Sequence, residues 1–148
     1  MKWTKLLWMA IVSFLAMYAV MYAMVDKYEN IYLNINQFYM VLMMTAVMML
    51  IEIFFMRSMY SLKTQTTTVV LSVFLLVFSF AGIRYQFFVS DIKFLKSMIP
   101  HHASALLMCD NSKIKDIEIK NLCNSIISGQ QAEIDWMKIK LEDWGYKN

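Results

Sequence analysis

Three long apolar runs occupy most of the first ninety residues of the chain. They extend from Leu6 to Val25, from Phe38 to Tyr60 and from Thr68 to Val89. Each run is about as long as the ~20 residues that a helix needs to cross the hydrocarbon of a bilayer. Because lipid offers the backbone no hydrogen bonds, a run lying in a membrane must be helical. The pattern predicts a membrane region over residues 1–90, with transmembrane helices at about 6–25, 38–60 and 68–89.

Beyond Ser90 the apolar positions recur with the period of an amphipathic helix. One predicted stripe consists of Phe94, Met98, His101, Ala105 and Met108. A turn is expected at 110–112, and a second helix begins near residue 116. Its predicted stripe consists of Ile119, Cys123, Ile126, Gln130, Glu133, Met137 and Leu141. The fold class is therefore all-α, with three spans followed by a helical hairpin over residues 91–148.

The charges follow the same division of the chain. Residues 1–90 contain 6 Lys/Arg and 3 Asp/Glu, whereas residues 91–148 contain 8 of each. The net charge of +3 comes without a clustered basic patch, so nucleic acid is not an expected partner. The bilayer is. Positive residues lie before the first span and around the second connection, which predicts a cytoplasmic N-terminus and an extracytoplasmic hairpin.

Both cysteines of the chain, Cys109 and Cys123, lie in the hairpin. Outside the cytoplasm such a pair is expected to form a disulfide, and the alternative is two free thiols. If the pair is bridged, residues equally far from the two cysteines on antiparallel helices face each other. His102 then lies opposite Gln130, with Glu133 about one turn further along the same face.

These side chains together make a candidate metal site. Imidazole suits copper, zinc, nickel or iron, and thioether favours reduced copper, so copper is the expected cofactor. The predicted ligands are His101, His102 and Glu133, with Met98, Met108, Met137 and Gln130 as weaker candidates. Neighbouring histidines point about 100° apart on a helix, so the two rings do not easily bind one ion. The alternative is a polar network that only joins the two helices.

Glu52 is an ionisable residue inside the second apolar run. Carboxylates within a membrane are functional candidates, although a structural polar contact between spans is the simpler interpretation. The chain has no Gly-rich phosphate loop and no nucleophile elbow, so the sequence indicates no catalytic residues and does not predict an enzyme. Redox catalysis at a bound metal is the alternative, and it requires an open coordination position.

Two segments of the hairpin share a pattern with a known family. They run F-x-x-x-M-x-x-H-H-x-x-A-x-x-M from Phe94 and I-x-x-x-Q-x-x-E-I-x-x-M from Ile126. This pattern resembles the family of the domain of unknown function 305, including its three-span membrane forms. The resemblance implies a ferritin-like four-helix bundle made by pairing hairpins, and some relatives are periplasmic copper-binding proteins.

The residues and the resemblance together predict a function. We expect a multi-pass protein of a bacterial inner membrane whose periplasmic hairpin binds copper, in copper homeostasis or resistance. The chain has no histidines beyond His101 and His102, which argues against high-capacity storage. A hairpin of this size leaves apolar surface uncovered, so a homo-oligomer or a larger complex is expected. The alternative is a structural or assembly subunit that binds no metal.

Overall fold

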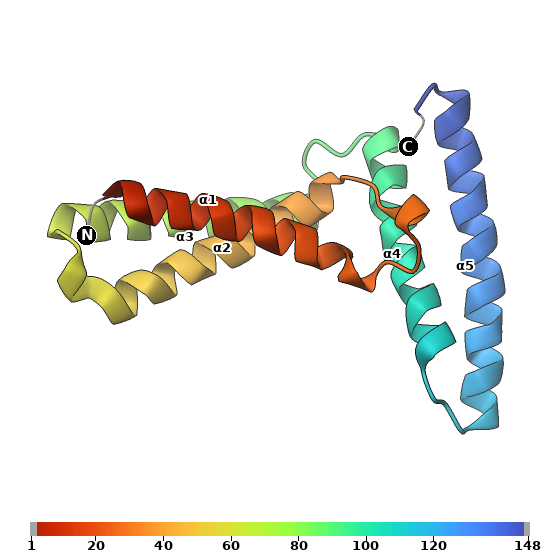
Figure 1. Cartoon of the computed structure of the whole chain (residues 1–148). Coiled ribbons are helices and arrows are strands. Elements are labelled where there is room, and N and C mark those ends of the chain that lie inside the picture. Colours follow the sequence, from red (N-terminus) through yellow and green to blue (C-terminus); the bar gives the residue numbers. More distant parts are fainter. Residues whose placement is uncertain (1–2, 147–148) are drawn as a thin grey trace. The chain divides into compact units, whose positions relative to one another are not determined.

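The computed structural model describes residues 3–146, and all regular secondary structure in that range is helical (Figure 1). The chain forms two compact units. One, called here the membrane unit, combines Met1–Met21 with Ile35–Phe88. The other, the hairpin unit, combines Tyr22–Asn34 with Val89–Asn148. The hairpin unit therefore includes the connection between the first two long helices.

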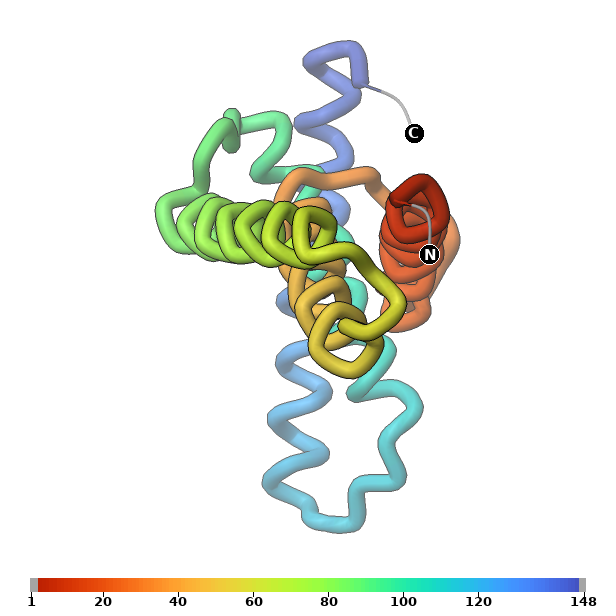
Figure 2. Tube along the Cα trace, turned by 90° about the vertical axis from the view of Figure 1, so that its left-hand side faces the viewer, coloured from red at the N-terminus to blue at the C-terminus, as the bar shows by residue number. Residues whose placement is uncertain are grey.

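The membrane unit contains α1 (Trp3–Val20), α2 (Ile35–Met56) and α3 (Leu62–Tyr85). With their short 3-10 extensions η1 (Met21–Met24) and η3 (Arg57–Met59), these helices are long and apolar enough to cross a membrane. In Figure 2 the three are seen nearly end-on, and α2 lies between α1 and α3. The three predicted spans are confirmed as helices of sufficient length and apolarity.

The third span begins six residues before its predicted start at residue 68. The Ser61 hydroxyl accepts a hydrogen bond from the Thr64 backbone N–H and caps the helix at Leu62. At the other end Gln86 adopts the left-handed conformation (φ 52°), so the helix ends at Tyr85. Hydropathy located the apolar run, whereas caps determine where the helix begins and ends.

Helices α2 and α3 pack closely where small side chains allow it. A Cβ atom at Gly82 would lie 3.0 Å from Cζ of Tyr39, so only glycine leaves room for that ring. The Tyr39 hydroxyl donates a hydrogen bond of 2.8 Å to the Phe87 carbonyl oxygen. Ser72 and Ser79 are buried on the same face of α3, and their small side chains allow α2 to approach closely. Close approach of these two helices gives the membrane unit its most extensive contact.

Glu52 has a hydrogen-bond partner beside its own helix. The Tyr60 hydroxyl, just after η3, donates to Glu52 Oε1 at 2.8 Å. The Gln65 amide in turn donates to the carbonyl oxygens of Arg57 and Tyr60, which holds this turn together. The contact thus closes the end of α2 instead of joining two spans.

The hairpin unit is built on α4 (Asp91–Asn111) and α5 (Ile117–Asp143), which run antiparallel side by side (Figure 1). Asp116 caps α5 by accepting hydrogen bonds from the backbone N–H groups of Glu118 and Ile119. Pro100 lies inside α4 without ending it. The predicted hairpin is therefore confirmed as a pair of helices.

The apolar core of the hairpin uses a different stripe of α4 from the predicted one. The buried residues of this cluster on the two helices are Leu95, Ile99, Ala103, Leu106, Ile134, Met137 and Leu141. Phe94 and Met108 of the predicted α4 stripe are 48% and 57% exposed. Two stripes interleave on α4 with the same spacing, and periodicity alone does not say which one meets α5.

The connection between α1 and α2 completes the hairpin core. Tyr32 is only 7% exposed and belongs to the buried cluster, and Val25 packs against it. The Tyr22 hydroxyl donates to the Tyr32 carbonyl oxygen at 2.8 Å. Burial, and then the negative charge of Glu142, raise the pKa of the Tyr32 phenol. The hairpin core is therefore built from three segments rather than two.

Replacing Tyr32 by alanine is expected to destabilise the hairpin unit by about 2–4 kcal/mol, because a buried ring leaves a cavity. The amide protons of α4 and α5 should then exchange faster with solvent, by the amount that corresponds to this loss of stability. Tyr28→Ala, at an 87% exposed position of the same connection, is the matched control and should change little. Equal exchange in the two variants would contradict a core role for Tyr32.

Candidate functional site

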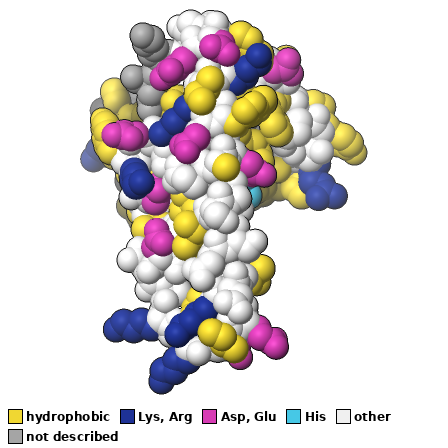
Figure 3. Space-filling view, turned by 90° about the vertical axis from the view of Figure 1, so that its right-hand side faces the viewer, with side chains coloured by type: hydrophobic (Ala, Val, Ile, Leu, Met, Phe, Trp, Pro, Cys, Tyr) yellow, Lys and Arg dark blue, Asp and Glu magenta, His cyan; other side chains and the backbone are white. Residues whose placement is uncertain are grey.

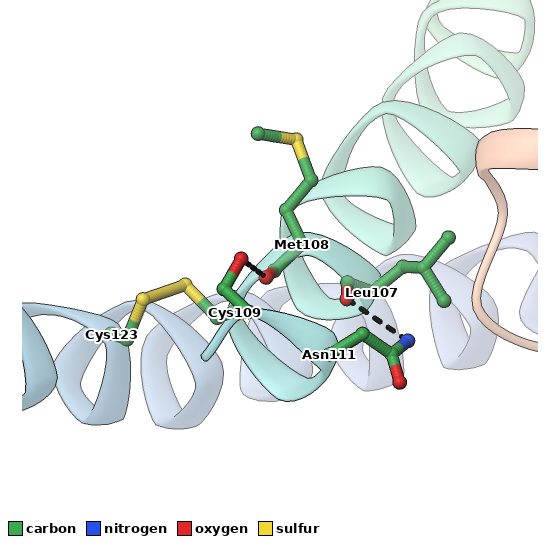
Figure 4. Close-up of a disulfide and its surroundings, with 6 residues drawn as sticks. Leu107, Met108, Cys109, Asn111 and Cys123 are labelled. Carbon is green, nitrogen blue, oxygen red and sulfur yellow. Dashed lines mark hydrogen bonds between the residues drawn. A yellow bond between two sulfur atoms is a disulfide. The ribbon is translucent and has the colours of Figure 1, made fainter. Parts of the chain in front are cut away.

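A disulfide joins α4 to α5 near the closed end of the hairpin (Figure 4). The Cα atoms of Cys109 and Cys123 are 5.3 Å apart, within the usual range, and the predicted pairing is confirmed in the structure. No residue between Leu107 and Ile126 is buried. The disulfide therefore holds the two helices together where the apolar core does not reach. Closing a loop of this length contributes about 3 kcal/mol in the chain-entropy description.

Polar side chains at the C-terminal end of α4 donate hydrogen bonds to carbonyl oxygens of its last turn. The Asn111 amide donates to the Leu107 carbonyl oxygen at 3.2 Å, and the Ser112 hydroxyl donates to that of Met108 (Figure 4). The Ser112 backbone N–H also donates to the Met108 carbonyl oxygen, so side-chain and backbone donors together close the last turn of α4. Cys109 lies in the last turns of this helix, and its disulfide to Cys123 holds the register of α4 against α5.

In that register the structure brings His102 and Glu133 together. Nδ1 of His102 lies 3.4 Å from Oε2 of Glu133. The imidazole side chain is 13% exposed, whereas the carboxylate side chain is 64% exposed. The distance is longer than a charge-assisted hydrogen bond of about 2.7–2.9 Å, and Nδ1 makes no hydrogen bond. The two groups face each other at the edge of the seam between the helices.

Gln130 supplies a second buried polar atom without a partner. Its side-chain oxygen Oε1 is buried and makes no hydrogen bond, as is true of His102 Nδ1. The disulfide register places the Gln130 position opposite His102. A buried polar atom without a partner costs about 1–3 kcal/mol, so this pair is poorly satisfied by protein groups alone.

The environment of His102 favours the neutral imidazole. Burial lowers its pKa below the ordinary value of 6.5, the Glu133 carboxylate partly offsets this, and His101 lowers it further. A neutral ring keeps a lone pair free. His102 is therefore in the protonation state that a metal ligand or a hydrogen-bond acceptor requires.

The other predicted ligands are dispersed. His101 is exposed, and its ring centroid lies 5.9 Å from that of His102, with the ring planes 58° apart. Met137 is buried in the apolar core, Met98 packs against that core, and Met108 is 57% exposed. Among the described residues, no three His, Cys, Asp or Glu side chains gather closely enough to hold an ion by themselves. The site within one chain is thus a small set of nitrogen and oxygen donors.

Large apolar side chains are exposed on the hairpin that carries this site. Trp136 of α5 follows Glu133 by three residues, which places both on one side of the helix, and Trp136 is 60% exposed. Phe94 and Leu122 are also exposed on the hairpin. Figure 3 shows hydrophobic side chains interrupting the charged surface of the hairpin. Sequence reasoning missed this surface because it placed Phe94 and Met108 toward the partner helix.

Comparison with known proteins gives two matches. The family model for a domain of unknown function (DUF305) matches residues 91–148. An uncharacterized protein, L153, of Acanthamoeba polyphaga mimivirus is 34% identical over 149 residues, covering 98% of this chain and 96% of the viral protein. That similarity extends over the spans as well as the hairpin. No solved structure matches the chain.

The stability of the hairpin unit should fall on acidification in a way that depends on His102. Since the folded pKa is lowered, the unfolded state binds more protons between that pKa and 6.5. Stability is therefore greatest above 6.5 and decreases as the pH falls through the folded pKa. Thermal unfolding from about pH 8 to about pH 5 should show this slope in the wild type and in His101→Gln. The His102→Gln variant should have a flatter profile, and an unchanged slope would show that His102 does not titrate as described.

Proposed function

The chain belongs to the family of the domain of unknown function 305, and from this premise we propose that it is a membrane-anchored metal-binding protein. In this proposal a divalent copper ion is held at the seam of the hairpin by His102 and Glu133. Gln130 is a weaker third ligand. The spans anchor the hairpin to the bilayer, and the protein serves copper binding, homeostasis or resistance.

The observation that carries the proposal is the unsatisfied imidazole nitrogen of His102 beside Glu133, with a second unsatisfied atom on Gln130, one turn before Glu133 on α5. His102 Nδ1 and Gln130 Oε1 are both buried without hydrogen-bond partners, and the Glu133 carboxylate is 3.4 Å from the former. A cation would satisfy the two atoms and would neutralise the carboxylate. The lowered pKa keeps the imidazole available for it at neutral pH. The residues present therefore fit a metal ion with few protein ligands.

The donor set favours oxidised copper over reduced copper. The two methionines nearest in sequence register, Met98 and Met137, are engaged in apolar packing, which leaves nitrogen and oxygen donors at the seam. For a given site of this type, Cu²⁺ binds more tightly than the other divalent first-row ions. A site with few ligands depends most on that intrinsic affinity. The bound ion would add positive charge and attract further ligands from solvent or a partner.

The proposed location is the extracytoplasmic side of a bilayer, which for a bacterial inner membrane is the periplasm. The cysteine pair supports this side, because disulfides persist in oxidising compartments. Lys5, Arg57 and Lys63 support it too, since they lie at the ends of the spans remote from the Tyr22–Asn34 connection. An oxidising compartment is also where Cu²⁺ is the stable form.

Copper binding is tested with the full chain purified in detergent, loaded with Cu²⁺ and dialysed. Wild type and His101→Gln should retain copper, with an electron paramagnetic resonance signal that shows imidazole nitrogen coupling. Both His102→Gln and Glu133→Gln should lose most of the retained metal. Equal copper content in wild type and His102→Gln would overturn the proposal.

A second candidate function is structural, and the absence of a three-ligand cluster in the described residues favours it. His102, Gln130 and Glu133 would then only join helices within a membrane assembly. Under this alternative, His102→Gln leaves metal content unchanged and instead alters thermal stability or the assembled state. The copper measurement and a melting curve on the same samples therefore separate the two functions.

We further propose that a second copy of the hairpin covers the apolar surface beside the site, giving four helices. Trp136→Lys should then weaken association strongly, because buried tryptophans dominate interface energies. The control is Ile139→Lys, equally exposed at 60% but six residues beyond Glu133, on another side of α5. Light scattering in detergent should report a smaller particle for Trp136→Lys than for wild type, and no change for Ile139→Lys. A wild-type chain that is already monomeric would contradict the pairing.

A further inference from the structure

A cavity of about 290 Å³ lies between the three long helices of the membrane unit. Its lining is almost entirely apolar and comes from every one of these helices. Side chains that line it include Trp3, Leu6, Ala10 and Phe14 of α1, Ala46 of α2 and Leu75 of α3. The space is partly open to its surroundings rather than enclosed.

The cavity exists because α1 packs loosely while α2 and α3 pack tightly. Leu6 is the buried residue of α1, and the remaining described residues of that helix are partly or fully exposed. The lining includes Ala10 of α1 and Ala46 of α2, whose side chains are too small to fill the space between the two helices. Small residues that face each other without a tight contact leave room for another apolar group.

The dimensions of the cavity match one leaflet of a bilayer. Its lining on α1 runs from Trp3 to Leu15. At 1.5 Å per residue this is about 18 Å, roughly half of the hydrocarbon thickness. Trp3 lies at one end, where an indole ring favours the level of the lipid headgroups. A single acyl chain entering beside Trp3 would extend toward the bilayer centre.

The end of the cavity beside Trp3 is positively charged. Lys5 lies in the first turn of α1 and Lys63 in the first turn of α3, and both are exposed. Neither helix contains an acidic residue. This arrangement complements the negative charge of an anionic lipid. The carboxylate of α2 nearest this lining, Glu52, lies one turn beyond Met49 and accepts a hydrogen bond from the Tyr60 hydroxyl.

We infer that this cavity binds one anionic phospholipid. An acyl chain fills the space between α1, α2 and α3, and the lipid phosphate lies beside Lys5 and Lys63. The bound chain supplies the apolar contacts that α1 does not obtain from the protein, and so holds α1 against α2. This inference is independent of metal binding by the hairpin.

The test uses the full chain, delipidated in detergent and mixed with phosphatidylglycerol or with phosphatidylcholine. Native mass spectrometry then measures the fraction of protein that retains a lipid. Ala10→Phe places a ring in the cavity, and Ala16→Phe makes the same change at an exposed position of α1 that does not line it. Ala10→Leu is a smaller filling variant, and circular dichroism with thermal unfolding checks that each variant is folded.

Wild type and Ala16→Phe should retain phosphatidylglycerol, and Ala10→Phe should lower the retained fraction by about tenfold or more. Ala10→Leu should lie between them. Wild type should retain phosphatidylglycerol in preference to phosphatidylcholine, because the net negative charge of the former attracts Lys5 and Lys63 and the latter is zwitterionic. The double variant Lys5→Gln/Lys63→Gln should retain the two lipids equally, because it lacks these cations. Equal retention by wild type and Ala10→Phe would overturn the inference. So would retention of detergent only, or loss of an oligomer without loss of lipid, which would assign the cavity to a second copy.

Discussion

Side-by-side packing of α4 and α5 governs which polar side chains of the hairpin can meet. The apolar core determines their separation, and the Cys109–Cys123 disulfide holds their register where that core ends. A shift by one turn would separate His102 from Glu133 and would expose or bury different atoms. His102 Nδ1 and Gln130 Oε1 lie at the seam without hydrogen-bond partners because packing elsewhere in the hairpin fixes where the two helices meet. Their chemistry depends on contacts that involve none of them directly.

The hairpin core also depends on a segment far away in sequence. Tyr32 and Val25 lie in the connection between α1 and α2 and pack into the cluster formed by α4 and α5. The three long helices of the membrane unit are long and apolar enough to cross a bilayer, and three such crossings would leave the connection and the hairpin on the same side. Two short helices with one shared seam bury little surface, and a third segment increases it. The connection is thus a structural part of the domain that carries the candidate site.

The membrane unit follows different physics from the hairpin. Its helices satisfy their backbone groups internally, and they associate through small side chains and a few hydrogen bonds rather than through hydrophobic burial. Gly82 beneath Tyr39 and the hydrogen bond from the Tyr39 hydroxyl to the Phe87 carbonyl oxygen are examples. Where such contacts are sparse, as along α1, lipid is the natural neighbour. This difference explains why α2 and α3 pack closely while a cavity remains beside α1.

Hydropathy and helical periodicity in the sequence were sufficient to predict three spans, a hairpin, the cysteine pair and the approach of His102 to Glu133. These features depend on local pattern and on one covalent link. The sequence did not predict the start of α3 at Leu62, the exposed side of Phe94 and Met108, or the insertion of Tyr32. A cap, the choice between two interleaved stripes and a contact across sixty residues each depend on which surfaces meet in three dimensions. Periodicity determines that a helix has an apolar face, but only tertiary packing decides what that face covers, because several faces compete for the same partner.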